Sequence, residues 1–137
     1  MMLLATDLDG TFLGGTTEKR QILYQLVRNH PDVQLVFVTG RGVETVLPLL
    51  YDPLVPTPDY VIADVGATVV DGSRLLPVTS IQSVIERNWP GKFVVRKRLS
   101  SVKGLTPQEV PQQRRCSFYY DETTDIGEIE RIASTLN

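Results

Sequence analysis

The chain has almost none of the chemistry that thiols and imidazoles provide. Its 137 residues include one cysteine, Cys116, and one histidine, His30. A single cysteine cannot form a disulfide within the chain, which suits a reducing compartment, and we expect a cytoplasmic protein. With one histidine, neither a zinc site of the His/Cys type nor a Ser-His-Asp triad is expected.

Long apolar runs are also missing. No stretch reaches the roughly 18 apolar residues that a membrane span requires, and Asp7 and Asp9 interrupt the apolar N-terminus, so neither a membrane helix nor a secretion signal is predicted. Hydrophobic residues make up 42% of the chain and charged residues 22%, with a mean hydropathy of -0.05. This composition is typical of a globular protein with an ordinary core.

The net charge is only -2, but basic residues are concentrated in the segment 92–115, which has Glu109 as its single acid. The basic residues there are Lys92, Arg96, Lys97, Arg98, Lys103, Arg114 and Arg115. Aromatic side chains do not interleave with them and no nucleic-acid motif is present, so nucleic-acid binding is not expected. The segment either faces an anionic ligand or is a solvated strand-and-loop region, and the pattern favours the second interpretation.

Short apolar runs bounded by glycine, proline or aspartate predict strands at 2–6, 34–38 and 60–63, with helices at about 17–29 and 43–51 between them. This alternation is typical of a parallel α/β sheet with right-handed crossovers. Val69-Val70 and Leu75-Leu76 then predict a hairpin around Asp71-Gly72.

The pattern changes after Pro77. We expect a short helix ending near Trp89, strands at 93–95 and 116–120, and a helix over 126–136. The change predicts two parts, an α/β core at 1–79 and a second α+β unit at 80–137.

Polar residues follow each of the three predicted core strands. These residues are Asp7 and Asp9, then Thr39, Gly40 and Arg41, and finally Asp64 and Gly66. Ligands of parallel α/β sheets bind beyond the carboxyl ends of the strands, so we expect these residues at one edge of the sheet.

A carboxylate at this edge can attack phosphorus to form an aspartyl-phosphate. Mg²⁺ relieves the repulsion between the two anions, and a second carboxylate can protonate the leaving alcohol and then activate water. Asp7 and Asp9 can supply both carboxylates, while the Thr39 hydroxyl and the Gly40 amide can hold phosphate oxygens.

The run Asp7-Leu8-Asp9-Gly10-Thr11 resembles the first motif of the haloacid dehalogenase superfamily of phosphohydrolases, and Phe37-Val38-Thr39-Gly40-Arg41 resembles the second. Together with Pro58-Asp59-Tyr60 and Asp64-Val65-Gly66, these runs are similar to the sucrose-phosphate phosphatase branch. The resemblance implies a Rossmann-like core followed by the first half of an α/β cap, and a small sugar phosphate as substrate.

In that family Asp7 would be the nucleophile and a Mg²⁺ ligand, and Asp9 the acid/base, offering its main-chain carbonyl to the metal. Thr39 and Gly40 would bind the phosphoryl group. Arg41 would assist them or act as a cap. Asp64 is either a turn residue or faces the site, and Gly66 is expected in a loop near the substrate.

Two family motifs, a lysine and a second acidic metal motif, are not found. Lys103-Gly104 imitates the first, and the segment from Phe118 to Asp125 imitates the second, but both fall in the cap region, and Asp121 to Asp125 is interpreted as a turn capping the last helix. We therefore expect a C-terminally truncated chain, inactive or nearly so alone, with exposed sheet edges that favour self-association or a partner fragment.

Other classes of function stay open beside this one. The main alternative is a non-catalytic remnant or an interaction protein that binds phosphate or Mg²⁺ without turnover. A phospho-acceptor domain is a further option, although the cap-like second part argues against it. A calcium loop from Asp7 to Glu18 is disfavoured because Phe12 stands where such a loop needs glycine.

Overall fold

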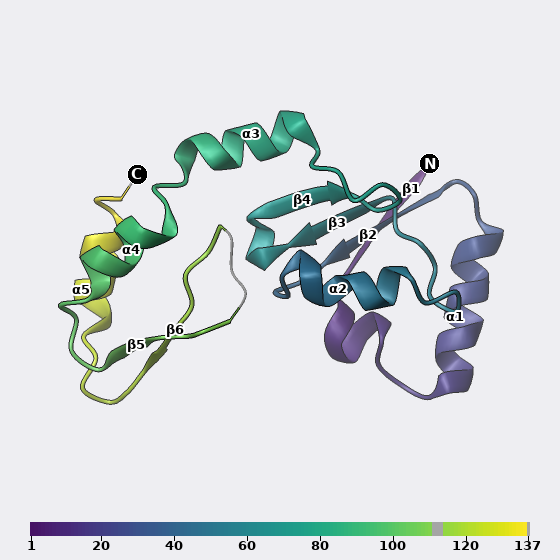
Figure 1. Ribbon diagram of the computed structural model, residues 1–137. Helices are drawn as coiled ribbons and strands as arrows, with labels where there is room; N and C mark the ends of the chain where they lie inside the picture. Colours follow the sequence, from purple (N-terminus) through teal and green to yellow (C-terminus); the bar gives the residue numbers. More distant parts are fainter. Residues whose placement is uncertain (111–113, 137) are drawn as a thin grey trace. The chain divides into compact units, whose positions relative to one another are not determined.

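A computed structural model describes residues 1–110 and 114–136. The chain divides into two compact units, Met1–Gln82 and Ser83–Asn137, called unit 1 and unit 2 below. Unit 1 carries a four-stranded sheet and unit 2 a two-stranded sheet with two helices (Figure 1). The division falls inside helix α3 (Thr79–Asn88), a few residues beyond the position predicted from the sequence.

The sheet of unit 1 has the strand order β1-β2-β3-β4. Strands β1 (Met2–Thr6), β2 (Val33–Val38) and β3 (Tyr60–Ala63) run parallel, as the apolar runs predict. β4 (Thr68–Asp71) pairs antiparallel with β3, which was not anticipated. On the other edge of β4, the predicted hairpin is present only as one bridge, between Val70 and Pro77.

The crossover helices α1 (Thr17–Asn29) and α2 (Val43–Leu50) pack against one face of this sheet (Figure 1). Between them lies the core, with Phe12 stacked on Tyr24 at a centroid distance of 4.9 Å and tilted against Phe37 at 5.1 Å. The other buried members of this core are Leu8, Leu35, Val46, Val55, Val61, Ala63 and Val70. Burial of this set removes apolar area from water, which stabilises unit 1.

Helix α1 spans Thr17 to Asn29, as predicted. Its N-cap is Thr16, whose hydroxyl accepts a hydrogen bond from the Lys19 amide. On the same helix Leu23 and Val27 pack against the core, whereas Ile22 and Leu26 are exposed.

The Pro58-Asp59-Tyr60 run fixes the register of β3. The Asp59 amide donates to the Leu35 carbonyl at 2.8 Å, and the Asp59 carboxylate accepts from the Leu35 amide at 2.7 Å. The Gly72 amide donates to the Asp59 carbonyl, and a Cβ at Gly72 would collide with the Pro58 carbonyl. This run is therefore structural, since it joins β2, β3 and the turn after β4 away from the strand ends that carry Asp7 and Thr39.

The two outer strands of the sheet differ in whether their free edge is covered. The edge of β4 is covered, because the Val69 amide donates to the buried Gln82 side chain and the Val78 amide donates to the Val69 carbonyl. In the part of the chain that the structure describes, β1 pairs with β2 alone, and Met2 and Leu3 are exposed. Such an open, apolar edge favours pairing with another strand.

Unit 2 corrects one prediction. The Phe93–Val95 run, predicted to be a strand, belongs to helix α4 (Lys92–Leu99). Val95 and Leu99 lie four residues apart and both are buried, so the helix places them on one side, toward Val102. Tertiary packing here overrides the strand preference of the Phe-Val-Val run.

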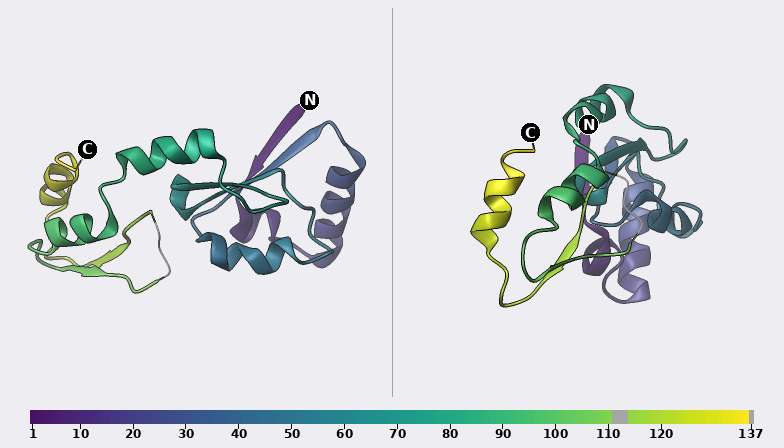
Figure 2. Two further views of the ribbon diagram at one scale, coloured as in Figure 1. Left: turned by 45° about the horizontal axis from the view of Figure 1, so that its top comes forward. Right: turned by 60° about the vertical axis from the view of Figure 1, so that its left-hand side comes forward.

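Strands β5 (Leu105–Pro107) and β6 (Phe118–Tyr120) pair antiparallel, and α4 and α5 (Ile126–Ala133) contribute to one small core with them (Figure 2). The predicted turn before the last helix is confirmed: Asp125 is the N-cap of α5 and accepts from the Glu128 amide. In α5, Ile129 and Ile132 face the small core, whereas Ile126 and Ala133 are exposed.

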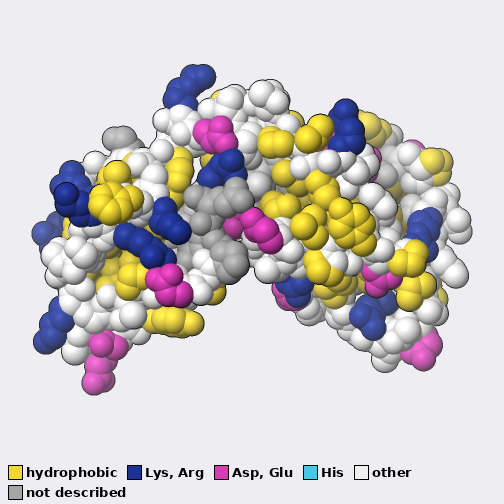
Figure 3. All heavy atoms as spheres, in the orientation of Figure 1, with side chains coloured by type: hydrophobic (Ala, Val, Ile, Leu, Met, Phe, Trp, Pro, Cys, Tyr) yellow, Lys and Arg dark blue, Asp and Glu magenta, His cyan; other side chains and the backbone are white. Residues whose placement is uncertain are grey.

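The basic segment 92–115 lies in unit 2, with positions 111–113 outside the described residues. On the face shown in Figure 3, Lys and Arg side chains are scattered over this unit. Arg96 pairs with Glu109, and Arg114 with Glu86. No helix in the described part of the chain is both long and apolar enough to cross a membrane.

Candidate active site at the strand ends of unit 1

The acidic pair stands in a short helical turn directly after β1. Leu8 and Phe12 of this turn are buried in the core, which leaves Asp7 and Asp9 on the solvent side. The turn closes when the amides of Phe12 and Leu13 donate to the carbonyls of Asp7 and Leu8. It is interrupted at Gly10, whose φ of 74° lies in the left-handed region that favours glycine.

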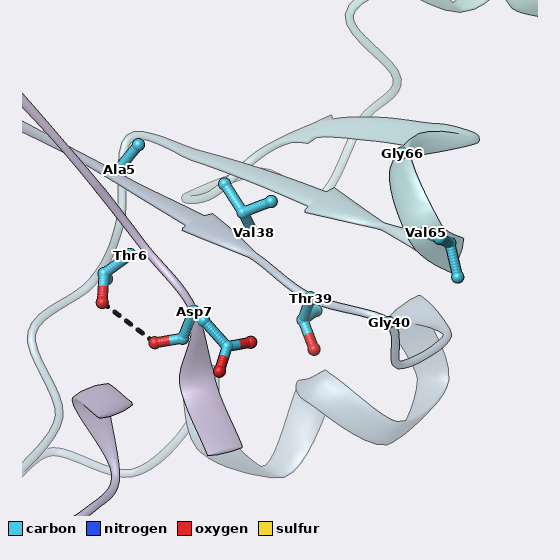
Figure 4. A pocket seen from close by; sticks show the side chains of 8 residues that line it. All are labelled: Ala5, Thr6, Asp7, Val38, Thr39, Gly40, Val65 and Gly66. Carbon is cyan, nitrogen blue, oxygen red and sulfur yellow. Dashed lines mark hydrogen bonds between the residues drawn. The ribbon is translucent and has the colours of Figure 1, made fainter. Parts of the chain in front are cut away.

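Asp7 is held by two neighbouring threonines. The Thr11 hydroxyl donates to the Asp7 carboxylate at 3.3 Å, and the Thr6 hydroxyl donates to the Asp7 carbonyl at 2.9 Å. The carboxylate extends toward the side chain of Thr39, at the end of the neighbouring strand (Figure 4). The two strand ends thus present a carboxylate and a hydroxyl to the same space.

Thr39 continues the line of β2 into the following turn. Its amide donates to the Ile62 carbonyl at 2.9 Å, and its side-chain oxygen accepts from the Arg41 amide at 3.1 Å. The residue is buried, with 4% of its surface exposed, so its hydroxyl is held in place. Gly40 follows it and is exposed.

A pocket of ≈ 570 Å³ opens at these strand ends. It is lined by Ala5, Thr6, Asp7, Val38, Thr39, Gly40, Val65 and Gly66 (Figure 4). Its polar end combines one carboxylate, two hydroxyls and glycine backbone, while its other walls are apolar. Such a combination can hold a small polar group beside a carboxylate and leave an apolar surface for the rest of the ligand.

Arg41 and Asp9 form a bidentate ion pair. The Arg41 Nε donates to one Asp9 oxygen at 2.8 Å and a terminal nitrogen donates to the other. Hydrogen bonding to Asp9 raises the pKa of the Arg41 guanidinium further above its ordinary value. The Arg41 side chain therefore pairs with Asp9, whereas the sequence left open whether Arg41 assists phosphate binding or acts as a cap.

Asp64 and Gly66 begin and end the turn after β3. Asp64 is buried, and its carboxylate accepts from the Thr68 hydroxyl at 2.8 Å, so this side chain is held inside the turn. Gly66 lines the pocket. Of the residues predicted from the sequence, the pocket brings together Asp7, Thr39, Gly40 and Gly66; Asp9 and Arg41 pair with each other outside its lining.

Four further lining residues were not predicted as site residues from the sequence: Ala5, Thr6, Val38 and Val65. Thr11, the last residue of the first motif, also contributes to the site. It lies four residues after Asp7, and its hydroxyl donates a hydrogen bond to the Asp7 carboxylate. Val65 belongs to the Asp64-Val65-Gly66 run, but its backbone conformation could not be predicted from the sequence, because this residue type rarely adopts it.

The oxygens at the acidic pair suit a hard divalent cation. The exposed Asp7 carboxylate and the Asp9 main-chain carbonyl are the donors that Mg²⁺ prefers, and such sites commonly rely on one or two carboxylates with phosphate and water completing the shell. Within residues 1–110 and 114–136, no group of three or more His, Cys, Asp or Glu side chains is placed to hold a metal.

Solved structures share this fold. The chain matches the sucrose-phosphatase of Synechocystis sp. PCC6803, solved with sucrose and phosphate, at a TM-score of 0.72 and 19% identity, over 98% of this chain and 55% of that one. It matches a haloacid dehalogenase-like hydrolase from Bacillus subtilis at a TM-score of 0.63 and 18% identity, over 98% and 55%. The shared fold and the pocket define the class of protein, an α/β protein with a candidate site at the carboxyl ends of parallel strands.

Within that class, the chain belongs to the sucrose-6F-phosphate phosphohydrolase family, whose model matches residues 1–137, so it is a hydrolase by family. A glucosylglycerol-phosphate synthase from Pseudomonas anguilliseptica is 51% identical over 136 residues, which are 98% of this chain and 18% of the relative. A mannosylfructose-phosphate phosphatase from Agrobacterium fabrum is 29% identical over 139 residues, 95% of this chain and 54% of the relative. The chain thus spans about half of the phosphatase and less than a fifth of the synthase.

Proposed function

We propose that the chain carries the nucleophile of a Mg²⁺-dependent phosphomonoester hydrolase that acts on a small sugar phosphate. The observation that carries the proposal is the pocket in which the Asp7 carboxylate meets the Thr39 hydroxyl and Gly40. Membership of the family supports hydrolysis of a sugar phosphate. The relatives favour a phosphorylated glycoside, since their names specify glucosylglycerol phosphate and mannosylfructose phosphate.

The reaction would run in two displacements at Asp7. In the first, an Asp7 oxygen bonds to phosphorus, the bond between phosphorus and the sugar oxygen breaks, and Asp9 gives its proton to the leaving alkoxide. In the second, Asp9 takes a proton from water, the water oxygen bonds to phosphorus, and the aspartyl-phosphate bond breaks to release inorganic phosphate. Thr39 and Gly40 would hold the phosphoryl oxygens throughout.

Mg²⁺, held by Asp7 and the Asp9 carbonyl, would reduce the repulsion between the attacking carboxylate and the phosphate. Arg41 would hold the Asp9 carboxylate in one orientation, because its guanidinium contacts both oxygens of that group. This arrangement makes Arg41 a positioning residue for the acid/base.

The direct test uses beryllium fluoride with Mg²⁺, which together imitate a phosphoryl group on an aspartate. We expect the backbone amide signals of Thr11, Thr39 and Gly40 in ¹⁵N-labelled chain to shift, and Asp7→Asn to abolish the shifts. Asp32→Asn, an exposed aspartate of the same unit, is the matched control and should preserve them. Shifts that survive Asp7→Asn would assign the site to another residue.

Turnover by the 137 residues alone is expected to be very slow. The sequence offers Asp7 and Asp9 but neither the lysine nor the second acidic motif that the resemblance implies. Phosphate release from sucrose 6-phosphate with Mg²⁺ should therefore barely exceed the background of Asp7→Ala. Robust release that Asp7→Ala abolishes would refute this expectation and leave the proposed chemistry in place.

A second candidate is a protein that binds phosphate and Mg²⁺ without turnover. The ion pair favours it, because Arg41 engages both oxygens of the carboxylate that would have to exchange protons. Binding of beryllium fluoride together with an absence of turnover in a longer chain that includes both missing motifs would select this candidate.

A further inference from the structure

The turn after β3 has an unusual backbone. Asp64, Val65 and Gly66 have φ angles of 52°, 58° and 92°, so three successive residues lie in the left-handed region. For Val65 this conformation is especially unfavourable, because its β-branched side chain crowds the backbone there.

Hydrogen bonds to the neighbouring strand end maintain this conformation. The Asp64 amide donates to the Arg41 carbonyl at 2.8 Å, and the Val65 amide donates to the Thr39 carbonyl at 3.3 Å. The Thr68 hydroxyl donates a hydrogen bond to the Asp64 carboxylate. The turn is therefore tied to the residues that follow β2, including Thr39 of the pocket.

The fold gains little from the Val65 side chain itself. Its surface is 73% exposed, so it contributes almost nothing to the core of unit 1. It lies instead at the pocket, and its Cγ2 stands 4.0 Å from the position that a Cβ on Gly40 would occupy (Figure 4). Strain that does not serve packing points to a role in the site.

We propose that Val65 is a specificity-determining residue that contacts the apolar C–H face of the sugar in a bound phosphomonoester. This inference rests on the proposed function, because it takes the phosphate to lie between Asp7, Thr39 and Gly40. Val65, Val38 and Ala5 are apolar members of the pocket lining, so a ligand whose phosphate lies beside Gly40 meets apolar side chains in the same pocket. Sugar rings present C–H faces that bury well against such side chains.

The test compares two ligands on two variants. Val65→Gly removes both the strain and the contact, and Val65→Asn relieves the strain with a polar side chain that tolerates the left-handed region. Dissociation constants for inorganic phosphate and for sucrose 6-phosphate, each with Mg²⁺, are measured by NMR titration before any phosphate is released. The control is Val84→Asn, at an exposed valine of α3.

For both Val65 variants we expect a higher melting temperature, an unchanged constant for inorganic phosphate, and binding of sucrose 6-phosphate weakened about tenfold. Val84→Asn should change neither constant. If Val65 is strained because it contacts the sugar, its replacement raises the melting temperature and weakens the binding of sucrose 6-phosphate alone. A purely structural role would not produce this combination.

Several results would overturn the inference. Equal weakening of the binding of both ligands would indicate a general structural role for the turn. Unchanged dissociation constants would show that Val65 does not contact the ligand. A lower melting temperature in both variants would mean that Val65 is packed and not strained for recognition. If the unmodified chain binds inorganic phosphate but sucrose 6-phosphate no more tightly, this inference alone fails; if it binds neither, the proposed function fails with it.

Discussion

Unit 1 and unit 2 bury their apolar side chains by different means. Unit 1 places two helices on a four-stranded sheet, and its core includes the fully buried aromatics Phe12 and Phe37. Unit 2 has a two-stranded sheet, and among its described residues the buried members of its core are Val95, Leu99 and Val102. Helix α5 buries none of its residues fully, although Ile129 and Ile132 contact that core.

This difference in packing indicates which unit is the more stable one, and the candidate site lies in that unit. The residues of the candidate site all belong to unit 1, where buried strands hold the main chain of Asp7 and Thr39. The ion pairs of unit 2, such as Arg114–Glu86, are partly exposed and add little stability, because water and salt screen them. We therefore expect unit 1 to unfold at a higher temperature than unit 2.

The largest effect is expected from Phe37→Ala. The side chain is fully buried and touches Phe12, so its removal leaves a cavity that costs about 3–5 kcal/mol. Chemical denaturation followed by far-ultraviolet circular dichroism measures the loss. Phe93→Ala, at a 78% exposed phenylalanine of α4, is the matched control and should change the free energy of unfolding by less than about 0.5 kcal/mol.

A smaller and more local effect is expected from Leu99→Ala, which should cost about 2–3 kcal/mol within unit 2. Trp89 is the only tryptophan and packs against the core of unit 2, so its fluorescence reports on that unit. The fluorescence midpoint should fall while hydrogen exchange of the β2 and β3 amides stays the same. Loss of protection in those strands would show that the two units unfold together.

The open edge of β1 provides a third test. Met2 and Leu3 are exposed there, whereas the segment 76–82 covers the opposite edge at β4. We expect the average mass in light scattering to rise with concentration and Leu3→Lys to reduce the rise, because charge on an edge strand opposes pairing. The control is Ile22→Lys, at an exposed position of α1, which should not reduce the rise in mass. A mass that stays monomeric at all concentrations would contradict the prediction.

The smallest effect concerns pH and compares one aspartate in each unit. Hydrogen bonds, the largest from the Arg74 amide, hold the pKa of Asp71 well below its usual range, and Thr123 lowers the pKa of Asp121. A lowered pKa stabilises the folded chain above the unfolded value of about 3.9, and this contribution disappears as the pH falls toward the folded value.

Melting temperatures between pH 7 and pH 2 measure both contributions. Asp71→Asn should lower the melting temperature of unit 1 at pH 7 and flatten its decline below pH 4, and Asp121→Asn should do the same for the Trp89 signal of unit 2. Asp32→Asn should leave both curves unchanged. Because Asp121 is exposed and Asp71 partly exposed to solvent, each shift should be modest, and a steeper acid decline in either variant would contradict the argument.

The sequence by itself determined the three parallel strands and the two helices between them. Apolar runs such as Leu35 to Val38 are long enough to cross a buried sheet, and α1 has the bounds that the sequence predicts, Thr17 to Asn29. From these elements the parallel-sheet rule placed Asp7, Thr39 and Gly66 at one edge. Each of these conclusions depends on neighbours in the chain, which is why local patterns sufficed.

Only the tertiary structure decided the features that depend on residues far apart in sequence. Helix α4 forms where Phe93 to Val95 predicts a strand, because burial of Val95 and Leu99 on one side outweighs local preference. Arg41 meets Asp9 across 32 positions, and the Thr39 and Arg41 carbonyls hold the turn that puts Val65 at the pocket. Contacts between separate strand ends create these arrangements, so no single segment encodes them.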